Sequence, residues 1–352
     1  MKIALSILAL AIVFGTTAQI NRGNGGGGEG SSTPAKFKSK RDSLENTGPR
    51  NEACNCNTDI ELEGGNKLIY HKKTGKPYSG TCVSYYDNRQ RQRVAKFING
   101  NEHGNSFTYY ENGQMQTITT WENGTEHGTW GYWHENGQLA WANTYEMGMK
   151  TGQWYYYTAD SLPVKYLEYV NDKLHGPCRY YYPDGDVKKV INYGEGKFNG
   201  SYMTFYKDSV LKLEKTFVNN QLEGEAKMYH ENGQIAYITK YASGTKIGKW
   251  EYFHENGQTK KVGEFAGGEQ DGLWEFFLED GKKQASILYD KGVEKKVVEY
   301  DRFGKPKNDG DLGELQAMLK NKEAREALED DKKKKKKKKK KNPKEGEWGH
   351  ID

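Results

Sequence analysis

The chain has 352 residues and is poor in apolar residues, at 34 % of the total, but rich in Gly (42) and Tyr (25). So few aliphatic side chains exclude one thick core, whereas Tyr and Trp suit thin, half-solvated sheets. The formal net charge is +5, and Lys332 to Lys341 supply ten of the positive charges, so the rest of the chain sums to −5. We therefore do not expect the acidic remainder to bind nucleic acid.

Residues 1–18 have the pattern of a secretory signal peptide. Lys2 precedes an apolar run over residues 3–14, and small residues then permit cleavage after Ala18. The run is too short for a transmembrane helix. We expect an exported protein, periplasmic, on the cell surface or secreted; the alternatives are an N-terminal anchor and a buried helix. Residues 19–60 are rich in Gly, Ser and Lys and predict a flexible linker.

From residue 80 onward, the chain repeats every 24 residues without insertion or deletion. Positions 5 and 17 of the repeat are always aromatic, and position 8 is always Asn or Asp. This constant spacing indicates one structural unit, and the glycine at position 0 is expected to permit close packing or an unusual φ at a bend. The marker glycines of the nine units are Gly80, Gly104, Gly128, Gly152, Gly176, Gly200, Gly224, Gly248 and Gly272.

Each unit carries two turn signals. Positions 8 and 9 are Asn-Gly or Asp-Gly in six units, a strong hairpin signal because both residues accept positive φ. A second turn falls at position 20, which is usually Gly. The segments between the turns, about six and eight residues long, predict two antiparallel strands per unit. A looser first turn is expected in three units, at Asn88-Arg89, Asp160-Ser161 and Asp208-Ser209.

The unit at residues 127–138, His-Gly-Thr-Trp-Gly-Tyr-Trp-His-Glu-Asn-Gly-Gln, resembles MORN repeats of the bacterial MORN repeat variant form. The resemblance covers residues 80–295 and implies an all-β fold, an elongated single-layer antiparallel β-meander of MORN-type hairpin repeats. The family includes YwqK-type antitoxin components, so the resemblance also implies a possible antitoxin-like role. The characteristic Tyr/His-Glu-Asn-Gly-Gln turn stands at residues 110–114, 134–138, 230–234 and 254–258.

The flanks of the array are expected to cover its end strands and to add a short C-terminal helix and disordered ends. Residues 61–79 predict an N-terminal cap and partial repeat, and residues 296–310 a partial repeat and cap. Residues 331–352 are a self-repelling poly-Lys tail, expected to be disordered, with an anionic polymer or membrane surface as candidate partner. Residues 311–330 predict one helix with a weak apolar stripe of Leu312, Leu315, Leu319 and Leu328.

The four cysteines allow one type of disulfide. Cys82 and Cys178 occupy equivalent positions four units apart, roughly 38 Å at two strands per unit and about 4.8 Å per strand, so they cannot be bridged. Either Cys54 or Cys56 could pair with Cys82, which export would permit. No second cysteine pair accompanies Cys54 and Cys56 to suggest a metal site.

No catalytic, metal or cofactor site is predicted. Histidines recur before the marker glycine and beside the first turn, but equivalent positions of neighbouring units lie about 9.6 Å apart, too far to share a zinc ion. Aromatic packing and turn hydrogen bonds explain them. The acidic residues of the turns are copies of one motif, whereas catalysis needs one asymmetric constellation.

Both strand faces carry aromatic residues, so the sequence does not identify the buried face. Rigid aromatic side chains are good contact residues. Positions 2 and 4 vary between units, whereas positions 5 and 17 are always aromatic, so specificity is expected at the variable positions. The predicted binding surface is Trp130, Tyr132, Trp154, Tyr156, Tyr180, Tyr202, Trp250, Tyr252 and Trp274.

These observations predict an exported, non-catalytic scaffold that binds another protein, of unknown identity, through an aromatic β-ribbon. Antitoxin-like sequestration of a toxin is a special case of this function. It ranks below a general surface or periplasmic role, because an exported protein would not neutralise a toxin inside the producing cell. The alternative is a cell-wall or carbohydrate-binding module, because residues 152–157 are similar to the Gly-x-Trp-Tyr-Tyr core of choline-binding repeats. A hydrolytic enzyme ranks third, since no segment outside the array is large enough for a catalytic domain.

Overall fold

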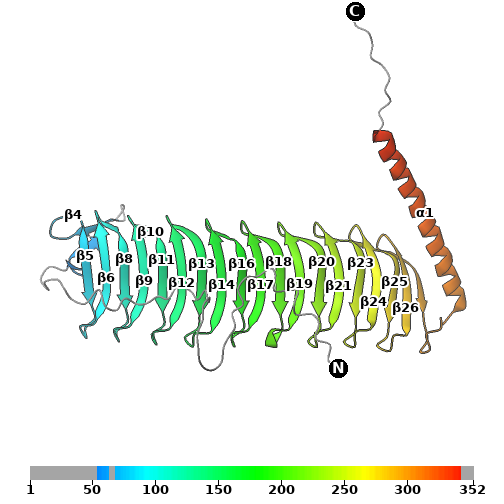
Figure 1. Cartoon of the computed structure of the whole chain (residues 1–352), viewed down its shortest axis with the longest axis horizontal. Helices are drawn as coiled ribbons and strands as arrows, with labels where there is room; N and C mark the ends of the chain where they lie inside the picture. Colours follow the sequence, from blue (N-terminus) through cyan, green and yellow to red (C-terminus); the bar gives the residue numbers. More distant parts are fainter. Residues whose placement is uncertain (1–53, 63–67, 342–352) are drawn as a thin grey trace, which may run out of the picture. The chain divides into compact units, whose positions relative to one another are not determined.

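The computed structural model describes residues 54–62 and 68–341. The expected signal peptide, residues 1–18, lies outside the described residues, as do most of the expected linker and residues 342–352. The described chain forms one sheet of 24 strands and a separate sheet of three. Figure 1 shows the large sheet as a single layer whose strands lie side by side in chain order. The predicted all-β meander is confirmed.

Two strands per repeat build the large sheet. The first strands are β5 (Gly80–Tyr85), β8 (Gly104–Tyr109), β11 (Gly128–Trp133), β13 (Met149–Tyr157), β16 (Gly176–Tyr181), β18 (Lys197–Phe205), β20 (Gln221–Tyr229), β23 (Gly248–Phe253) and β25 (Glu269–Phe277). The second strands are β6 (Arg91–Ile98), β9 (Met115–Glu122), β12 (Leu139–Glu146), β14 (Pro163–Val170), β17 (Val187–Gly194), β19 (Leu211–Val218), β21 (Ile235–Ala242), β24 (Thr259–Ala266) and β26 (Lys283–Asp290).

Shorter elements interrupt or flank these strands. In four repeats a two-residue strand precedes the marker glycine: β7 (Asn101–Glu102), β10 (Thr125–Glu126), β15 (Lys173–Leu174) and β22 (Thr245–Lys246). A short 3₁₀ turn, η1 (Lys207–Ser209), lies between β18 and β19. The flanking elements are β1 (Cys54–Asn55), β2 (Ile60–Leu62), β3 (Ile69–His71), β4 (Lys76–Pro77), β27 (Val293–Glu299) and α1 (Asp309–Lys341).

Strand pairing is antiparallel within and between repeats. Within the fourth repeat, β13 and β14 form a hairpin in which Gly152 faces Tyr169 and Tyr156 faces Lys165. Between repeats, the second strand pairs with the first strand of the next unit, so that Trp141 of β12 also faces Tyr156. Each first strand is therefore bonded on both sides, and the nine hairpins form one continuous sheet.

The marker glycine places a bulge near the start of the first strand. Gly152 has a φ of 63°, in the left-handed region that side chains disfavour. The register of the neighbouring strand shifts opposite it, between Ala142 and Thr144. A Cβ at Gly152 would lie 3.6 Å from its nearest neighbour, on Thr144, which is ordinary contact. The glycine is thus required by backbone conformation, one of the two predicted roles, rather than by crowding.

The first turn differs from the one that Asn-Gly suggested. At Asn136-Gly137, only Gly137 has a positive φ, 83°. The amide of Gly137 donates to the carbonyl of His134 at 2.8 Å, and the amide of His134 donates to the carbonyl of Gln138 at 2.8 Å. This is a β-turn followed by one residue in the left-handed region, which is a three-residue hairpin loop. The turn with two positive φ values is the second one, where Asn123 has 49° and Gly124 has 78°.

The three first turns without glycine are strained rather than looser. Arg89 and Ser161 stand where other units have glycine, with φ of 68° and 62°. Their closing hydrogen bonds persist: the amide of Tyr86 donates to Gln90 at 2.9 Å, as in the glycine turns. The geometry of neighbouring hairpins imposes the left-handed conformation even on residues with a Cβ.

Hydrogen bonds join successive repeats along both turn edges. On the first-turn edge, the ring at position 6 reaches the carbonyl at position 5 of the next repeat, as from Tyr110 to Trp133 at 2.8 Å. Histidine replaces tyrosine in this role, since His254 Nε2 lies 2.9 Å from the carbonyl of Phe277. On the other edge, the amide of Gly124 donates to the carbonyl of Glu102 at 2.8 Å. These bonds hold each repeat in register with the next.

The N-terminal end of the sheet is capped by residues 54–55, which belong to the expected linker rather than to the expected cap at residues 61–79. Strand β1 pairs in parallel with β5, so the outer edge of the first repeat is occupied. Cys56 and Cys82 form a disulfide with Cα atoms 5.0 Å apart, one of the two pairings considered. Cys54 remains a buried free thiol beside Phe97 in a small apolar cluster. Residues 54–60 are therefore ordered, because strand pairing and the disulfide fix them.

The C-terminal helix α1 is longer than predicted and packs on the sheet through its first turns. Leu315 is buried against Leu288 of β26 and Val298 of β27. Leu328, predicted to share the stripe, is exposed, because the helix has left the sheet by this point. The helix continues through the lysine run to Lys341, which corrects the expectation of disorder from residue 331. The docked turns provide the nucleus, and lysine has a high helix propensity and suits a helix C-terminus.

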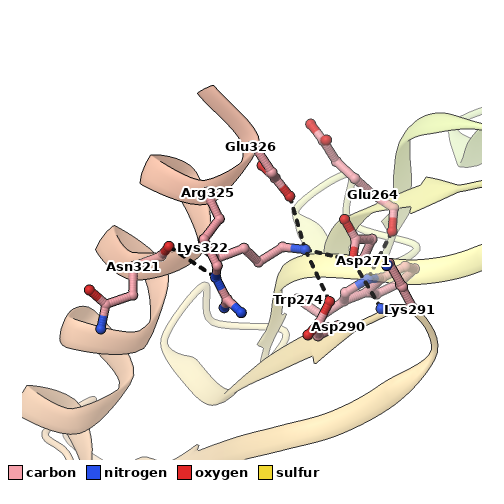
Figure 2. Close-up of polar contacts among 9 residues, drawn as sticks. All are labelled: Glu264, Asp271, Trp274, Asp290, Lys291, Asn321, Lys322, Arg325 and Glu326. Carbon is pink, nitrogen blue, oxygen red and sulfur yellow. Dashed lines mark hydrogen bonds and ion pairs between the residues drawn. The ribbon is translucent and has the colours of Figure 1, made fainter. Parts of the chain in front are cut away.

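An ion-pair cluster holds α1 to the last repeat (Figure 2). Lys322 Nζ lies 2.7 Å from Asp271 Oδ1 of β25, 3.0 Å from Glu326 Oε1 and 3.8 Å from Asp290 Oδ1. The side chains of Lys322 and Asp271 are only 12 % and 20 % exposed, so this pair is better shielded than a surface salt bridge. The amide of Lys291 also donates to Asp271, at 3.1 Å.

Acid should release the helix. Burial raises the pKa of Asp271, but the hydrogen bonds from Lys322 and from the amide of Lys291 outweigh it and hold this pKa below the ordinary 3.8. Because the pKa of Asp271 is lowered in the docked state, its carboxylate stabilises docking above pH 3.8. This stabilisation is lost as the pH falls through the lowered pKa. Hydrogen exchange of residues 309–330, corrected for intrinsic rates, should rise below about pH 4.

Asp271→Asn should weaken docking of α1 at neutral pH by about 1 kcal/mol, which lowers the docking equilibrium constant about fivefold. Hydrogen exchange of the helix in this variant should also depend less on pH. Glu326→Gln is the matched control, because Glu326 pairs with Lys322 from within the helix and contributes nothing to docking. Equal exchange in the two variants would contradict the assigned role of Asp271.

The strained first turns should be improved by glycine. The Cβ of Arg89 in the left-handed conformation costs about 1–2 kcal/mol, and Arg89→Gly removes this cost. The substitution also raises the conformational entropy of the unfolded chain, which destabilises the fold by roughly 0.5–1 kcal/mol. We expect a net gain of about 0.5–1 kcal/mol, read as a higher thermal midpoint. Asp87→Gly in the same turn, where φ is not positive, adds only the entropy and should lower the midpoint.

Candidate binding face

The strand register assigns the side chains to the two faces of the sheet, because directly opposed residues of neighbouring strands share a face. Positions 2 and 4 of the first strand lie on one face with positions 13, 15, 17 and 22; we call it the aromatic face. All nine residues of the predicted binding surface lie on it. In the fourth repeat these positions are Trp154, Tyr156, Lys165, Leu167, Tyr169 and Leu174.

Rings at positions 2 and 17 form ladders across the repeats. The contacts from Trp121 through Trp130, Tyr145 and Trp154 to Tyr169 have centroid separations of 4.8, 5.1, 5.2 and 4.9 Å. A second ladder runs from Tyr241 through Trp250, Phe265 and Trp274 to Tyr289. Tilted and edge-on rings at these separations attract one another, so the ladders join neighbouring repeats.

The tryptophans of position 2 belong to this core. Trp154, Trp250 and Trp274 are 5 %, 4 % and 1 % exposed. The indole N–H groups bond the backbone of the preceding repeat: Trp130 donates to the carbonyl of Thr120 at 2.9 Å, and Trp274 to that of Glu264 at 3.2 Å (Figure 2). Buried rings with satisfied N–H groups have little surface to offer a partner. We therefore treat Trp154, Trp250 and Trp274 as structural, whereas Trp130 is half-buried.

The tyrosines of position 4 are the accessible part of the predicted surface. Tyr132, Tyr156, Tyr180 and Tyr252 are half-buried, in a row with the side chains at position 13. Tyr132 stacks on Trp141 at 5.8 Å and 11°, and Tyr237 of the seventh hairpin lies 5.8 Å from Tyr252 of the eighth. Tyr202, the remaining predicted residue, is half-buried at position 2. The structure thus joins these residues into a row that crosses successive strands.

Lysine ammonium groups lie over the tyrosine rings of this row. Lys165 Nζ is 4.0 Å from the ring centroid of Tyr156, and Lys189 Nζ is 4.2 Å from that of Tyr180. Lys261 Nζ is 4.1 Å from the centroid of Tyr252. These are cation–π contacts, which orient the ammonium groups along the row. The aromatic face is therefore also a cationic one.

The tyrosine hydroxyls on this face remain neutral donors. Burial raises the pKa of Tyr156 to about 12, and nearby Tyr169 adds to the shift. Burial likewise raises the pKa of Tyr180 and of Tyr252. At physiological pH the positive charge of the lysines is therefore not offset by phenolate, and each hydroxyl can donate a hydrogen bond.

The opposite face has a different electrostatic character. Lys249 Nζ lies 2.7 Å from Glu251 Oε1, and Lys227 Nζ lies 3.5 Å from Glu225 Oε2 and 4.0 Å from Glu214 Oε1. Positive and negative side chains alternate there and neutralise one another. The two faces thus offer a partner different chemistry, and the aromatic face has the less usual one.

Sequence reasoning missed the lysines of the aromatic face. The signal was present: in a hairpin closed at positions 6–10, position 4 is opposed to position 13, which brings Tyr156 to Lys165 and Tyr180 to Lys189. It was obscured because lysine is spread over both faces. Among the described residues, no group of three or more His, Cys, Asp or Glu side chains could hold a metal ion.

Comparison with known proteins identifies the repeats. The family model "MORN repeat variant" matches four times, at residues 102–123, 174–194, 222–242 and 246–266. No curated protein matches the chain. No helix among the described residues is long and apolar enough to cross a membrane.

Two solved structures show only a weak likeness. One is a crystal structure of TcdB2-TccC3 without its hypervariable C-terminal region, 12 % identical over 66 % of this chain, with a TM-score of 0.19. The other is TcdB2-TccC3-TEV, 11 % identical over 64 % of this chain, with a TM-score of 0.17. This chain covers 16 % and 15 % of those chains. By these four matches, the 24-residue array of this chain contains repeats of the MORN repeat variant family.

Proposed function

We propose that this protein is an exported, non-catalytic scaffold that binds another protein through the aromatic face. The observation that carries the proposal is the row of half-buried side chains at positions 4 and 13, which holds aromatic rings in the third to fifth and the seventh to ninth repeats. This row is held on a sheet whose repeats are hydrogen-bonded at both edges. Tyrosine rings with few rotatable bonds lose little entropy on binding and are frequent at protein interfaces. A row that is already fixed needs little further ordering.

The repeated architecture also favours binding over catalysis. Each turn and each ring position is a copy of one motif, so the array offers many equivalent groups rather than one nucleophile with its own base and orienting group. Repeat arrays gain affinity by engaging several equivalent positions along an extended surface. The family match to interaction repeats is consistent with this function.

A carbohydrate-binding role has less support. Sugar rings and choline groups need open aromatic faces, but lysine ammonium groups already lie over Tyr156, Tyr180 and Tyr252. Trp154, the residue that carried the similarity to choline-binding repeats, is buried. Antitoxin-like sequestration is one form of the proposed function, with a toxin as the partner. The lysine run gives the helix a second, separate means of contacting anionic surfaces.

The test is capture of partners by the full chain from an extract of the producing cells. Lys332 to Lys341 are changed to Gln in all arms, so that the lysine run contributes nothing. Partners retained by this protein should be lost, by at least about tenfold, when Tyr156, Tyr180 and Tyr252 are changed to Ser, because three contact rings disappear. The measurement is the amount of each partner by mass spectrometry.

The matched control changes three exposed apolar side chains of the opposite face, Val164, Val170 and Val218, to Ser. These side chains are 43 %, 44 % and 47 % exposed, so their loss should leave capture unchanged. Circular dichroism verifies that both variants keep the sheet. Equal loss in the two variants, or capture only when the lysine run is intact, would remove the aromatic face from the proposal.

A further inference from the structure

Six lysines of the aromatic face have no opposite charge. Three hold position 13, one holds position 15 and two hold position 22, from the end of the third repeat to the eighth repeat. Each lies over one or two aromatic rings at 4.0–5.9 Å, and no carboxylate of the described chain pairs with any of them. The six are Lys150, Lys165, Lys189, Lys215, Lys246 and Lys261.

Acidic residues are missing from the same stretch of this face. Between Lys150 and Tyr289, positions 2, 4, 13, 15, 17 and 22 hold no Asp or Glu. The earlier repeats differ, since Glu102 and Glu126 occupy position 22 there, and Glu102 pairs with Arg93 at 2.8 Å. Acids return at the other end, where Glu294 occupies position 22 of the ninth repeat and faces Tyr289, so this face lacks acids between Lys150 and Tyr289. The central repeats therefore present a cationic stretch on this face, in an array that is acidic on the whole.

These charges are partly removed from water. Burial lowers the pKa of Lys215, and burial lowers that of Lys261, with Lys260 and Lys246 adding repulsion. A half-buried ammonium group without a counter-ion has lost part of its hydration and gained only the attraction of a ring. A carboxylate from outside would restore the missing interaction, so the face is complementary to an anion rather than merely tolerant of one.

We propose that the aromatic face of the fourth to eighth repeats binds an extended, acidic polypeptide segment that runs across the strands. This rests on the proposed function and names the chemistry of the partner. Equivalent lysines of adjacent repeats, such as Lys165 and Lys189, are about 9.6 Å apart. One turn of an extended chain in the polyproline II conformation has three residues and spans about 9.3 Å, so every third side chain points to the same side. Asp or Glu at every third residue would therefore meet successive repeats, with tyrosine hydroxyls as donors to the peptide backbone.

The geometry favours a peptide over other anionic ligands. A flat bilayer needs protruding basic side chains, but five of the six lysines are half-buried against rings and only Lys246 is exposed. Phosphate groups are matched best by the planar fork of arginine, and Arg179, the one arginine of these five repeats, faces the other side of the sheet at position 3. Single carboxylates suit the point charge of lysine.

The experiment measures binding of a fluorescein-labelled peptide of about twelve residues with Glu at every third position. The full chain is used, with Lys332 to Lys341 changed to Gln in every arm. The face variant carries Lys165→Gln, Lys189→Gln and Lys261→Gln. The control variant carries Lys188→Gln, Lys212→Gln and Lys260→Gln, which remove equal charge from exposed neighbouring positions, two of which also lie over tyrosine rings.

We expect the face variant to bind the peptide about tenfold or more weakly, and the control variant to change by less than about threefold, at low ionic strength. Binding should also be lost when Gln replaces Glu in the peptide. Equal losses in the two variants would overturn the inference. So would tighter, face-dependent binding of phosphatidylserine vesicles or of heparin. If partner capture depends on the tyrosines but not on these lysines, the proposed function stands and the acidic partner is wrong.

Discussion

A sheet of one layer has no second layer to bury its side chains, so each repeat must be buried by its neighbours. The ladders at positions 2 and 17 meet this constraint, because each ring packs against one from the adjacent hairpin. Large flat rings can cover a neighbour about 5 Å away, which short aliphatic side chains cannot do. This explains a composition rich in Tyr and Trp and poor in Leu, and it makes the stability of the array a sum of nearest-neighbour terms.

The same dependence on neighbours explains the constant repeat length. The ring ladders, the edge bonds from position 6 and the backbone bonds at position 20 all join residues at fixed separations in the chain. An inserted residue would move every strand position to the other face and break all three at once. Arg89 and Ser161 show how strongly the register is imposed, since both are held in left-handed conformations so that the turn keeps its length.

The sequence was sufficient for what is local and periodic. Strand lengths and both turn positions could be predicted from spacing, and the family resemblance from the residues of the turn motif. The buried face could not, because positions 2 and 5 are aromatic on opposite sides, and only the packing of whole ladders shows that Trp154 and Trp274 are core. The extent of α1 also escaped prediction, because charge repulsion in the lysine run was weighed without the helix nucleus that docking of Leu315 provides.

Burial and the proposed recognition use the same face of this sheet, and the two roles are assigned to different positions within the repeat. At position 2, Trp154, Trp250 and Trp274 are buried under rings of neighbouring units, whereas positions 4 and 13 remain half-open beside them. The tryptophan ladder therefore fixes the tyrosine row, and the tyrosine rings in turn fix the lysines that lie over them, as Tyr156 does for Lys165. Replacing a core ring would loosen the charges indirectly, while replacing a lysine leaves the ladders intact. The face can therefore vary in charge from repeat to repeat without loss of the fold, which is how one hairpin motif can carry a specific surface.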